Sequence, residues 1–168
     1  MSYITVTTLR PGDVGTDDTL RRMEGDAKAA AADAWREWGG ELWPNLTPWR
    51  RCLALRSWLD NAFRFKPDPP GVELVRHPRE MLQELARRGY AEGDCDDAAA
   101  LAAAVALACG LRVRWKVLAF QRGAPYAHVY AEVSPREGGK WCELDVTRPA
   151  ALPGLTPAVA RFAVVEWS

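Results

Sequence analysis

The N-terminal quarter of the chain repeats apolar residues with the period of an α-helix. Apolar side chains recur every three or four positions over residues 20–38, which predicts a helix that begins at Asp18 or Thr19. The pair Gly25-Asp26 is expected to divide this helix into two, with the aspartate capping the second part. The glycine pair at 39–40 should end it.

Two shorter amphipathic helices are expected next. Thr47-Pro48 and His77-Pro78 each place a capping residue before a proline, the arrangement typical of a helix start. Gly89 should end the second of these helices. The run KPDPP between them is incompatible with a helix, so we expect an extended chain over Phe65–Pro70.

A run of alanines follows a short acidic segment, GDCDD. Asp94 is expected to cap a helix there by accepting a hydrogen bond from the backbone N–H of Asp97, and Gly110 should mark the helix end. Beyond its acidic first turn this helix is apolar on every side, which predicts that it lies at the centre of the molecule. The apolar run Ala98–Gly110 is too short to cross a bilayer.

The period changes to two residues after Gly110, which indicates β-strands. Strands are expected over residues 113–119, 126–133, 140–146 and 161–167. Arg112, Arg114 and Lys116 share one face of the first strand and are expected to face solvent. Helices that precede strands favour the α+β class, with a three- or four-stranded antiparallel sheet packed on the alanine-rich helix.

The second and third strands bring two chemically active side chains together. When the apolar faces of these strands are aligned around the turn Ser134–Gly139, His128 stands directly opposite Asp145, with Cβ atoms about 5 Å apart. A register shifted by two residues would keep both on one face, but diagonal. A histidine oriented by a carboxylate is a candidate general base, although a hydrogen-bonded strand histidine is the simpler alternative.

Cys95 is the candidate nucleophile for such a pair. It opens the alanine-rich helix, where free backbone N–H groups and the helix dipole stabilise a thiolate and a developing oxyanion. Three neighbouring aspartates oppose this effect and would raise the thiol pKa, unless the imidazolium of His128 outweighs them. The other three cysteines are interpreted as small core residues.

No metal or cofactor is expected. The acidic residues around Cys95 lack the spacing and glycine of a calcium loop. A zinc site is disfavoured because the apolar alternation places Cys142 on the opposite sheet face from His128, which separates the four possible ligands Cys95, His128, Cys142 and Asp145.

Composition narrows the classes of partner. The 168 residues contain 22 Lys and Arg and 22 Asp and Glu, so no excess of positive charge favours binding to a nucleic acid. The chain opens MSYITVTTLRPGD, without a basic stretch followed by an apolar run, and contains no CxxC pair. We therefore expect a cytoplasmic location and no membrane partner. The oligomeric state is not determined by these features.

The segments GDCDDAAALAAAVALACGL, AHVYAEV and WCELDVT together resemble the transglutaminase-like cysteine protease superfamily, and in particular its short members from phages and prophages. The resemblance covers residues 47–149 and implies a papain-like α+β core at 47–168, preceded by an arm and helical extension at 1–46. It implies Cys95 as nucleophile, His128 as general base and acid, and Asp145 as the orienting carboxylate. A phage-encoded chain could also be virion-associated.

The function implied by this resemblance is acyl transfer from an amide of a peptide or protein substrate. Hydrolysis is the favoured reaction, and protein cross-linking by transamidation is the first alternative. The second alternative is a non-catalytic, phage-associated structural module that retains the fold. The candidates for a side chain that assists in binding the oxyanion are Gln83, Gln121, Trp49 and Trp141.

Overall fold

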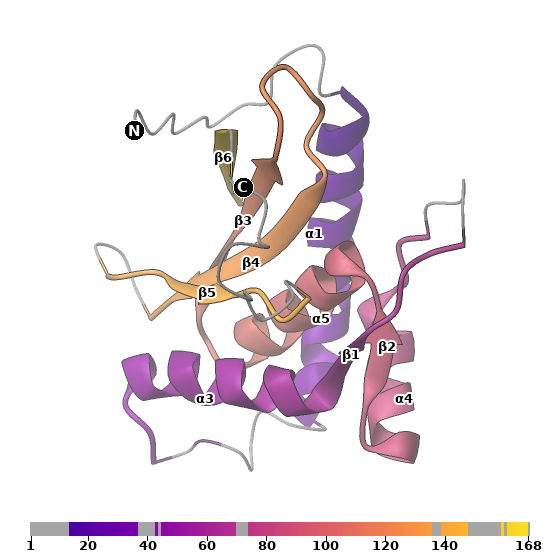
Figure 1. Ribbon diagram of the computed structural model, residues 1–168. Helices are drawn as coiled ribbons and strands as arrows, with labels where there is room; N and C mark the ends of the chain where they lie inside the picture. The colour runs from indigo at the N-terminus through magenta and orange to yellow at the C-terminus, as the bar shows by residue number, and fades with distance from the viewer. Residues whose placement is uncertain are drawn as a thin grey trace.

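The structure is a computed structural model that describes residues 14–36, 43, 45–69, 74–135, 139–147, 159 and 161–167. The described residues form four helices, a four-stranded antiparallel sheet and a separate two-stranded sheet (Figure 1). The helices are α1 (Val14–Ala34), α3 (Pro48–Ala62), α4 (Pro78–Arg88) and α5 (Cys95–Ala108). The strands are β1 (Phe63–Phe65), β2 (Ala91–Gly93), β3 (Arg112–Ala119), β4 (His128–Ser134), β5 (Cys142–Leu144) and β6 (Arg161–Glu166). The predicted α+β class is confirmed.

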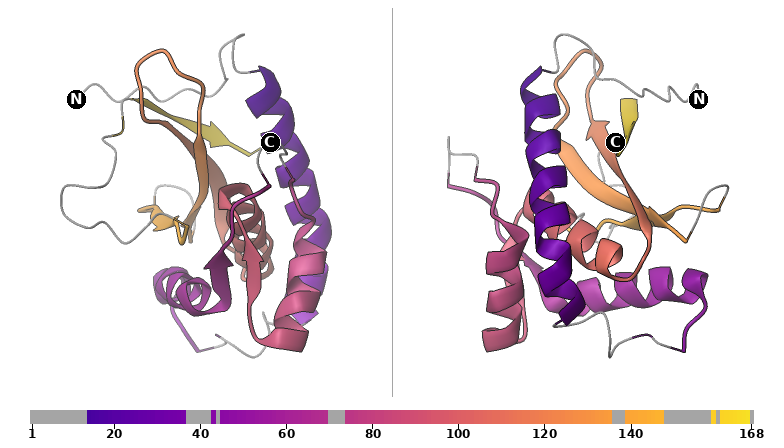
Figure 2. Two further views of the ribbon diagram at one scale, coloured as in Figure 1. Left: turned by 45° about the vertical axis from the view of Figure 1, so that its right-hand side comes forward. Right: turned by 180° about the vertical axis from the view of Figure 1, so that it is seen from behind.

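The alanine-rich helix α5 is central, as its sequence predicts. Every residue from Asp96 to Ala106 is buried. One side of α5 packs against the sheet, chiefly β4, and the other against α1 (Figure 2). Alanine side chains allow both neighbours to approach closely, because none projects beyond its Cβ. No helix in the described part of the chain is long and apolar enough to cross a membrane.

Helix α1 runs unbroken through Gly25, so the expected division into two helices is wrong. Gly25 is exposed and its surroundings are open. A helical glycine costs about 1 kcal/mol relative to alanine. The continuous apolar stripe that includes Met23, Ala27 and Ala30, all fully buried, outweighs that cost. The expected end at residues 39–40 lies outside the described residues.

The predicted caps of α3 and α4 are confirmed. The Thr47 side chain accepts a hydrogen bond from the backbone N–H of Arg50, and His77 Nδ1 accepts one from Arg79 at 3.1 Å. Gly89 ends α4 with a left-handed φ of 77°. The extended segment after α3 begins as strand β1, which pairs in parallel with β2, a contact that the sequence pattern did not predict.

The sheet has the strand order β5-β4-β3-β6. The predicted register of the β4–β5 hairpin is wrong by two residues: Val133 pairs with Cys142 and Ala131 with Leu144. Continued along the strands, this register places Tyr130 and not His128 opposite Asp145. The apolar alternation is satisfied equally well by either register, because it constrains pairing only in steps of two. The longer connection leaves Trp141 outside the strand, where its ring stacks on Arg114 at 4.0 Å.

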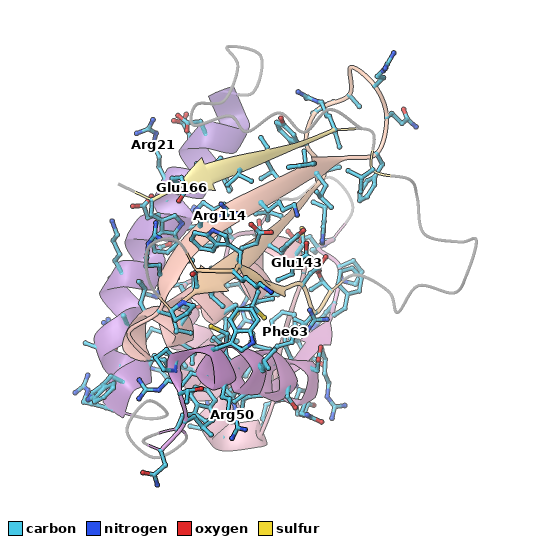
Figure 3. The ribbon with its side chains drawn as sticks, turned by 90° about the vertical axis from the view of Figure 1, so that its left-hand side faces the viewer. Arg21, Arg50, Phe63, Arg114, Glu143 and Glu166 are labelled. Carbon is cyan, nitrogen blue, oxygen red and sulfur yellow. The ribbon has the colours of Figure 1, made fainter. Side chains whose placement is uncertain are left out.

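The other face of the sheet carries a network of ion pairs. Glu132 is almost fully buried and bridges Arg114 and Lys116, at 2.7 and 3.2 Å. Arg114 also contacts Glu166 at 3.1 Å (Figure 3). Lys116 contacts Glu143 at 3.0 Å. Two of the three basic residues expected to face solvent are therefore neutralised by acidic neighbours.

Candidate active site

The three candidate site residues each stand at the end of an element. Cys95 is the first residue of α5, His128 is the first residue of β4, and Asp145 directly follows β5. These positions combine a rigid backbone on one side with access from the sheet end on the other. The central helix and two adjacent strands thus hold side chains that are 50 residues apart in sequence.

His128 and Asp145 are in direct contact. The distance from His128 Nε2 to Asp145 Oδ2 is 2.9 Å, although the two residues are diagonal rather than directly opposite. Their side chains are 11% and 6% exposed, so little water competes for this contact. The second carboxylate oxygen, Oδ1, accepts from the hydroxyl of Thr147 at 3.5 Å. Because Nε2 is engaged with Asp145, Nδ1 is the ring nitrogen of His128 that is left to act on another group.

Cys95 and His128 line the same pocket, which has a volume of about 330 Å³. The remaining lining residues come from α1, α5, β3, β4 and the segment before β4, and they are Thr19, Leu20, Met23, Asp96, Val117, Tyr126, Ala127 and Val129. Both residues therefore border one space that is large enough for part of a ligand.

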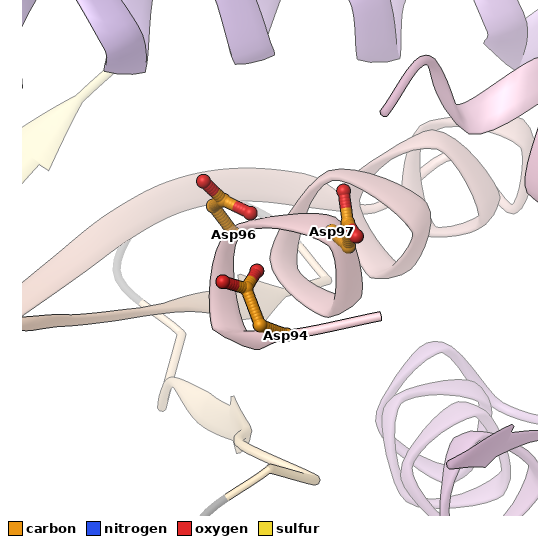
Figure 4. Close-up of side chains that lie close together, drawn as sticks. All are labelled: Asp94, Asp96 and Asp97. Carbon is orange, nitrogen blue, oxygen red and sulfur yellow. The ribbon is translucent and has the colours of Figure 1, made fainter. Parts of the chain in front are cut away.

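The acidic start of α5 is organised differently from the prediction. Asp94 occupies the capping position, but its side chain makes no capping hydrogen bond. Asp97 takes this role in reverse: its carboxylate accepts from the backbone N–H of Asp94, in the manner of a capping box. Its Oδ1 also accepts from the backbone N–H of Arg76 at 2.8 Å. Figure 4 shows the three aspartates around the first turn.

Burial dominates the electrostatics of Asp97. The residue is 1% exposed, and desolvation raises the pKa of its carboxyl to about 6 against the opposing effect of its hydrogen bond with Arg76. The side chain of Asp97 also lies against Gly93, where an added methyl group would approach Asp97 Cβ to 2.6 Å. Glycine at position 93 therefore leaves room for the buried carboxylate of Asp97 close to Cys95.

Asp94, Asp96 and Asp97 each place one oxygen within 4.8 Å of the others. These are the atoms that could contact a cation near Cys95. The position of Asp97 is explained by the hydrogen bonds that its carboxylate accepts from the backbone N–H groups of Arg76 and Asp94.

The other cysteines lie in environments that disfavour a thiolate. Burial raises the pKa of Cys52 and of Cys109 to about 11, and it raises the pKa of Cys142 as well. None of the three lines the pocket that contains Cys95.

The four side chains considered for the oxyanion, Gln83, Gln121, Trp49 and Trp141, do not line the pocket. Trp141 stacks on Arg114 at the outer sheet face, and Gln83 lies between α4 and α1 beside Arg79. Instead, the polar side chains of Thr19 and Tyr126 line the pocket. No local pattern in the sequence marked either residue, because each belongs to a segment far from Cys95 along the chain.

Comparison with known proteins adds the following. The family model of the transglutaminase-like superfamily matches residues 41–146. The chain is also similar to a crystal structure from Cytophaga hutchinsonii, described as a "putative cysteine protease", with 22% sequence identity and a TM-score of 0.49. That alignment covers 84% of this chain and 47% of the other, so the chain spans about half the length of that protein. No curated protein matches the chain.

Proposed function

The chain belongs to the transglutaminase-like superfamily, and we propose that it is a cysteine peptidase or amidase that acts through Cys95, His128 and Asp145. The observation that carries the proposal is the 2.9 Å contact between His128 and Asp145 at the pocket that Cys95 also lines. The order nucleophile, base and orienting carboxylate is that of a catalytic triad.

The proposed reaction begins when His128 removes the thiol proton of Cys95. The sulfur then attacks the amide carbonyl, and the backbone N–H groups at the start of α5 stabilise the oxyanion. His128 returns the proton to the leaving amine as the C–N bond breaks, which leaves a thioester on Cys95. Asp145 holds the ring and stabilises its protonated form.

Water completes the reaction in this proposal. His128 takes a proton from water, the resulting hydroxide attacks the thioester, and the acid product and free thiol are released. Ala127 at the pocket is exposed and Cys95 is only partly buried, which supports access of water to the acyl group. A primary amine in place of water would give transamidation.

The pairing of Cys95 with His128 is tested by measuring how fast iodoacetamide alkylates each cysteine as a function of pH. Peptide mass spectrometry distinguishes the cysteines. We expect Cys95 to react well below pH 8, since an unperturbed thiol has a pKa of about 8.5. The partly buried Cys142 is an internal control and should react only at higher pH, because burial raises its pKa. The variant His128→Ala should shift the Cys95 profile upward. An identical profile in the variant and the wild type would refute the pairing.

The role of the Asp145 carboxylate is tested by substitution. Asp145→Asn should reduce peptide or activated-ester turnover by about 100-fold or more, as expected for loss of an oriented base. Glu143→Gln, two residues earlier and directed toward Lys116, is the matched control and should retain activity.

Cys95→Ala should abolish acyl-enzyme formation. Retention of every measurable role by this variant would instead favour a structural module.

A fluorescent primary amine added to the same assay separates the two enzymatic outcomes. Release of the free acid alone supports hydrolysis. Incorporation of the amine into the product would overturn hydrolysis in favour of cross-linking.

A further inference from the structure

Helix α1 supplies part of the pocket wall although it lies outside the family-matched residues 41–146. Thr19, Leu20 and Met23 all line the pocket that contains Cys95 and His128. Because the family-matched segment begins after this helix, the candidate catalytic residues and part of the pocket wall come from different regions of the chain. A wall supplied from outside the core is suited to substrate selection.

Much of the pocket lining is apolar. Four of its lining residues are buried hydrophobic side chains, namely Leu20, Met23, Val117 and Val129. The volume of about 330 Å³ is near the lower end for ligand pockets and suits one large side chain better than an extended segment. Asp96 is the carboxylate of the lining, and no lysine or arginine of the described residues lines it.

We propose that this pocket selects a substrate residue with a large apolar side chain, such as leucine or phenylalanine, at the carbonyl attacked by Cys95. The inference rests on the proposed function. The residue that carries this carbonyl stays bonded to sulfur in the thioester, so its side chain must enter a space that begins at the thiol. The apolar lining favours leucine over alanine, and the carboxylate of Asp96 disfavours glutamate by like-charge repulsion.

The test uses N-acetyl amino acid p-nitrophenyl esters of leucine, alanine and glutamate. These probes share one leaving group and vary only the side chain on the acyl part. Sulfur attack forms a thioester at Cys95 and releases p-nitrophenol, which is measured as a burst, while mass spectrometry locates the acyl group. We expect the leucine ester to acylate Cys95 at least about tenfold faster than the alanine ester, and glutamate to be slowest.

Filling the pocket from its rim isolates the role of α1. Thr19→Phe places a ring at the pocket and should slow the leucine ester by about tenfold while changing the alanine ester little. Asp18→Phe introduces the same ring at the preceding exposed position, which does not line the pocket, and should preserve the preference.

A second pair of variants tests enlargement of the pocket. Met23→Ala should raise the rate of a phenylalanine ester relative to the leucine ester. Met81→Ala removes an equally buried methionine from α4, away from the pocket, and controls for loss of stability.

The outcomes separate the two proposals. Absence of acylation at Cys95 with every ester would overturn the proposed function itself. Acylation at equal rates for all side chains would leave the function in place and overturn the inference. The same would follow if each α1 variant changed selectivity no more than its control.

Discussion

Asp97 shows how a single buried carboxylate organises the start of the central helix. Its two backbone partners, Asp94 and Arg76, belong to the helix start and to the segment before α4. The side chain therefore joins two parts of the chain beside Cys95, and hydrogen bonds to the charged form offset only part of its desolvation.

The raised pKa of Asp97 predicts a pH dependence of stability. Burial raises it from 3.8 to about 6, so the folded state binds this proton more tightly than the unfolded state does. The contribution of Asp97 is therefore most favourable below pH 4 and is lost as the pH rises to 6, by up to about 3 kcal/mol. Urea unfolding at pH 4 and pH 7 should show a smaller loss in Asp97→Asn than in the wild type.

Asp60→Asn, at an exposed position on α3, is the control for this measurement and should keep the wild-type pH dependence. Equal pH dependence in Asp97→Asn and the wild type would contradict the prediction.

At the scale of elements, the junction between β2 and α5 is closely packed beside the site. Gly93 ends β2, and the side chain of Asp97 from the first turn of α5 folds back over it. The parallel pairing of β1 with β2 fixes the strand that leads into this turn. The position of Cys95 thus depends on a glycine two residues earlier.

Gly93→Ala should destabilise the protein by about 1–3 kcal/mol, because its methyl group would overlap Asp97 and neither backbone can move freely. The matched substitution Gly25→Ala, in the open middle of α1, should stabilise the helix by up to about 1 kcal/mol. Chemical denaturation measures both changes. Equal effects of the two substitutions would show that the space at Gly93 is not limiting.

At the scale of the whole molecule, α1 shares one hydrophobic core with the family-matched segment. Its residues Met23, Ala27 and Ala30 belong to the same buried cluster as α5 and the inner face of the sheet. The prediction that residues 1–46 form an extension divides the sequence and does not say whether this region folds separately. The described part of that region packs on α5, so we expect it to unfold together with the core.

Ala27→Asp would place a charge between α1 and α5 and should destabilise the whole protein by at least about 3 kcal/mol. Ala29→Asp, at an exposed position on the same helix, should change stability by less than about 0.5 kcal/mol. Thermal unfolding followed at tryptophan and by far-UV circular dichroism should give one coincident transition in each case. Separate transitions would show that α1 is an independent unit.

Local patterns in the sequence were sufficient for most elements. The caps at Thr47 and His77, the stop at Gly89 and the buried nature of α5 depend on neighbouring residues, and all are confirmed. The shared sheet face of His128 and Asp145 also follows from simple alternation. Their catalytic roles, with Cys95, stay predictions.

The tertiary structure decided the features that depend on distant segments. Alternation leaves the hairpin register undetermined by two residues, and only the folded structure shows that Val133 pairs with Cys142. The capping role of Asp97 rather than Asp94 required Arg76 to be near. The wall that Leu20 and Met23 add to the pocket required α1 to pack on α5. Short-range hydrogen bonds and periodicity depend on neighbouring residues, whereas these contacts form only when apolar faces from distant segments pack into one core.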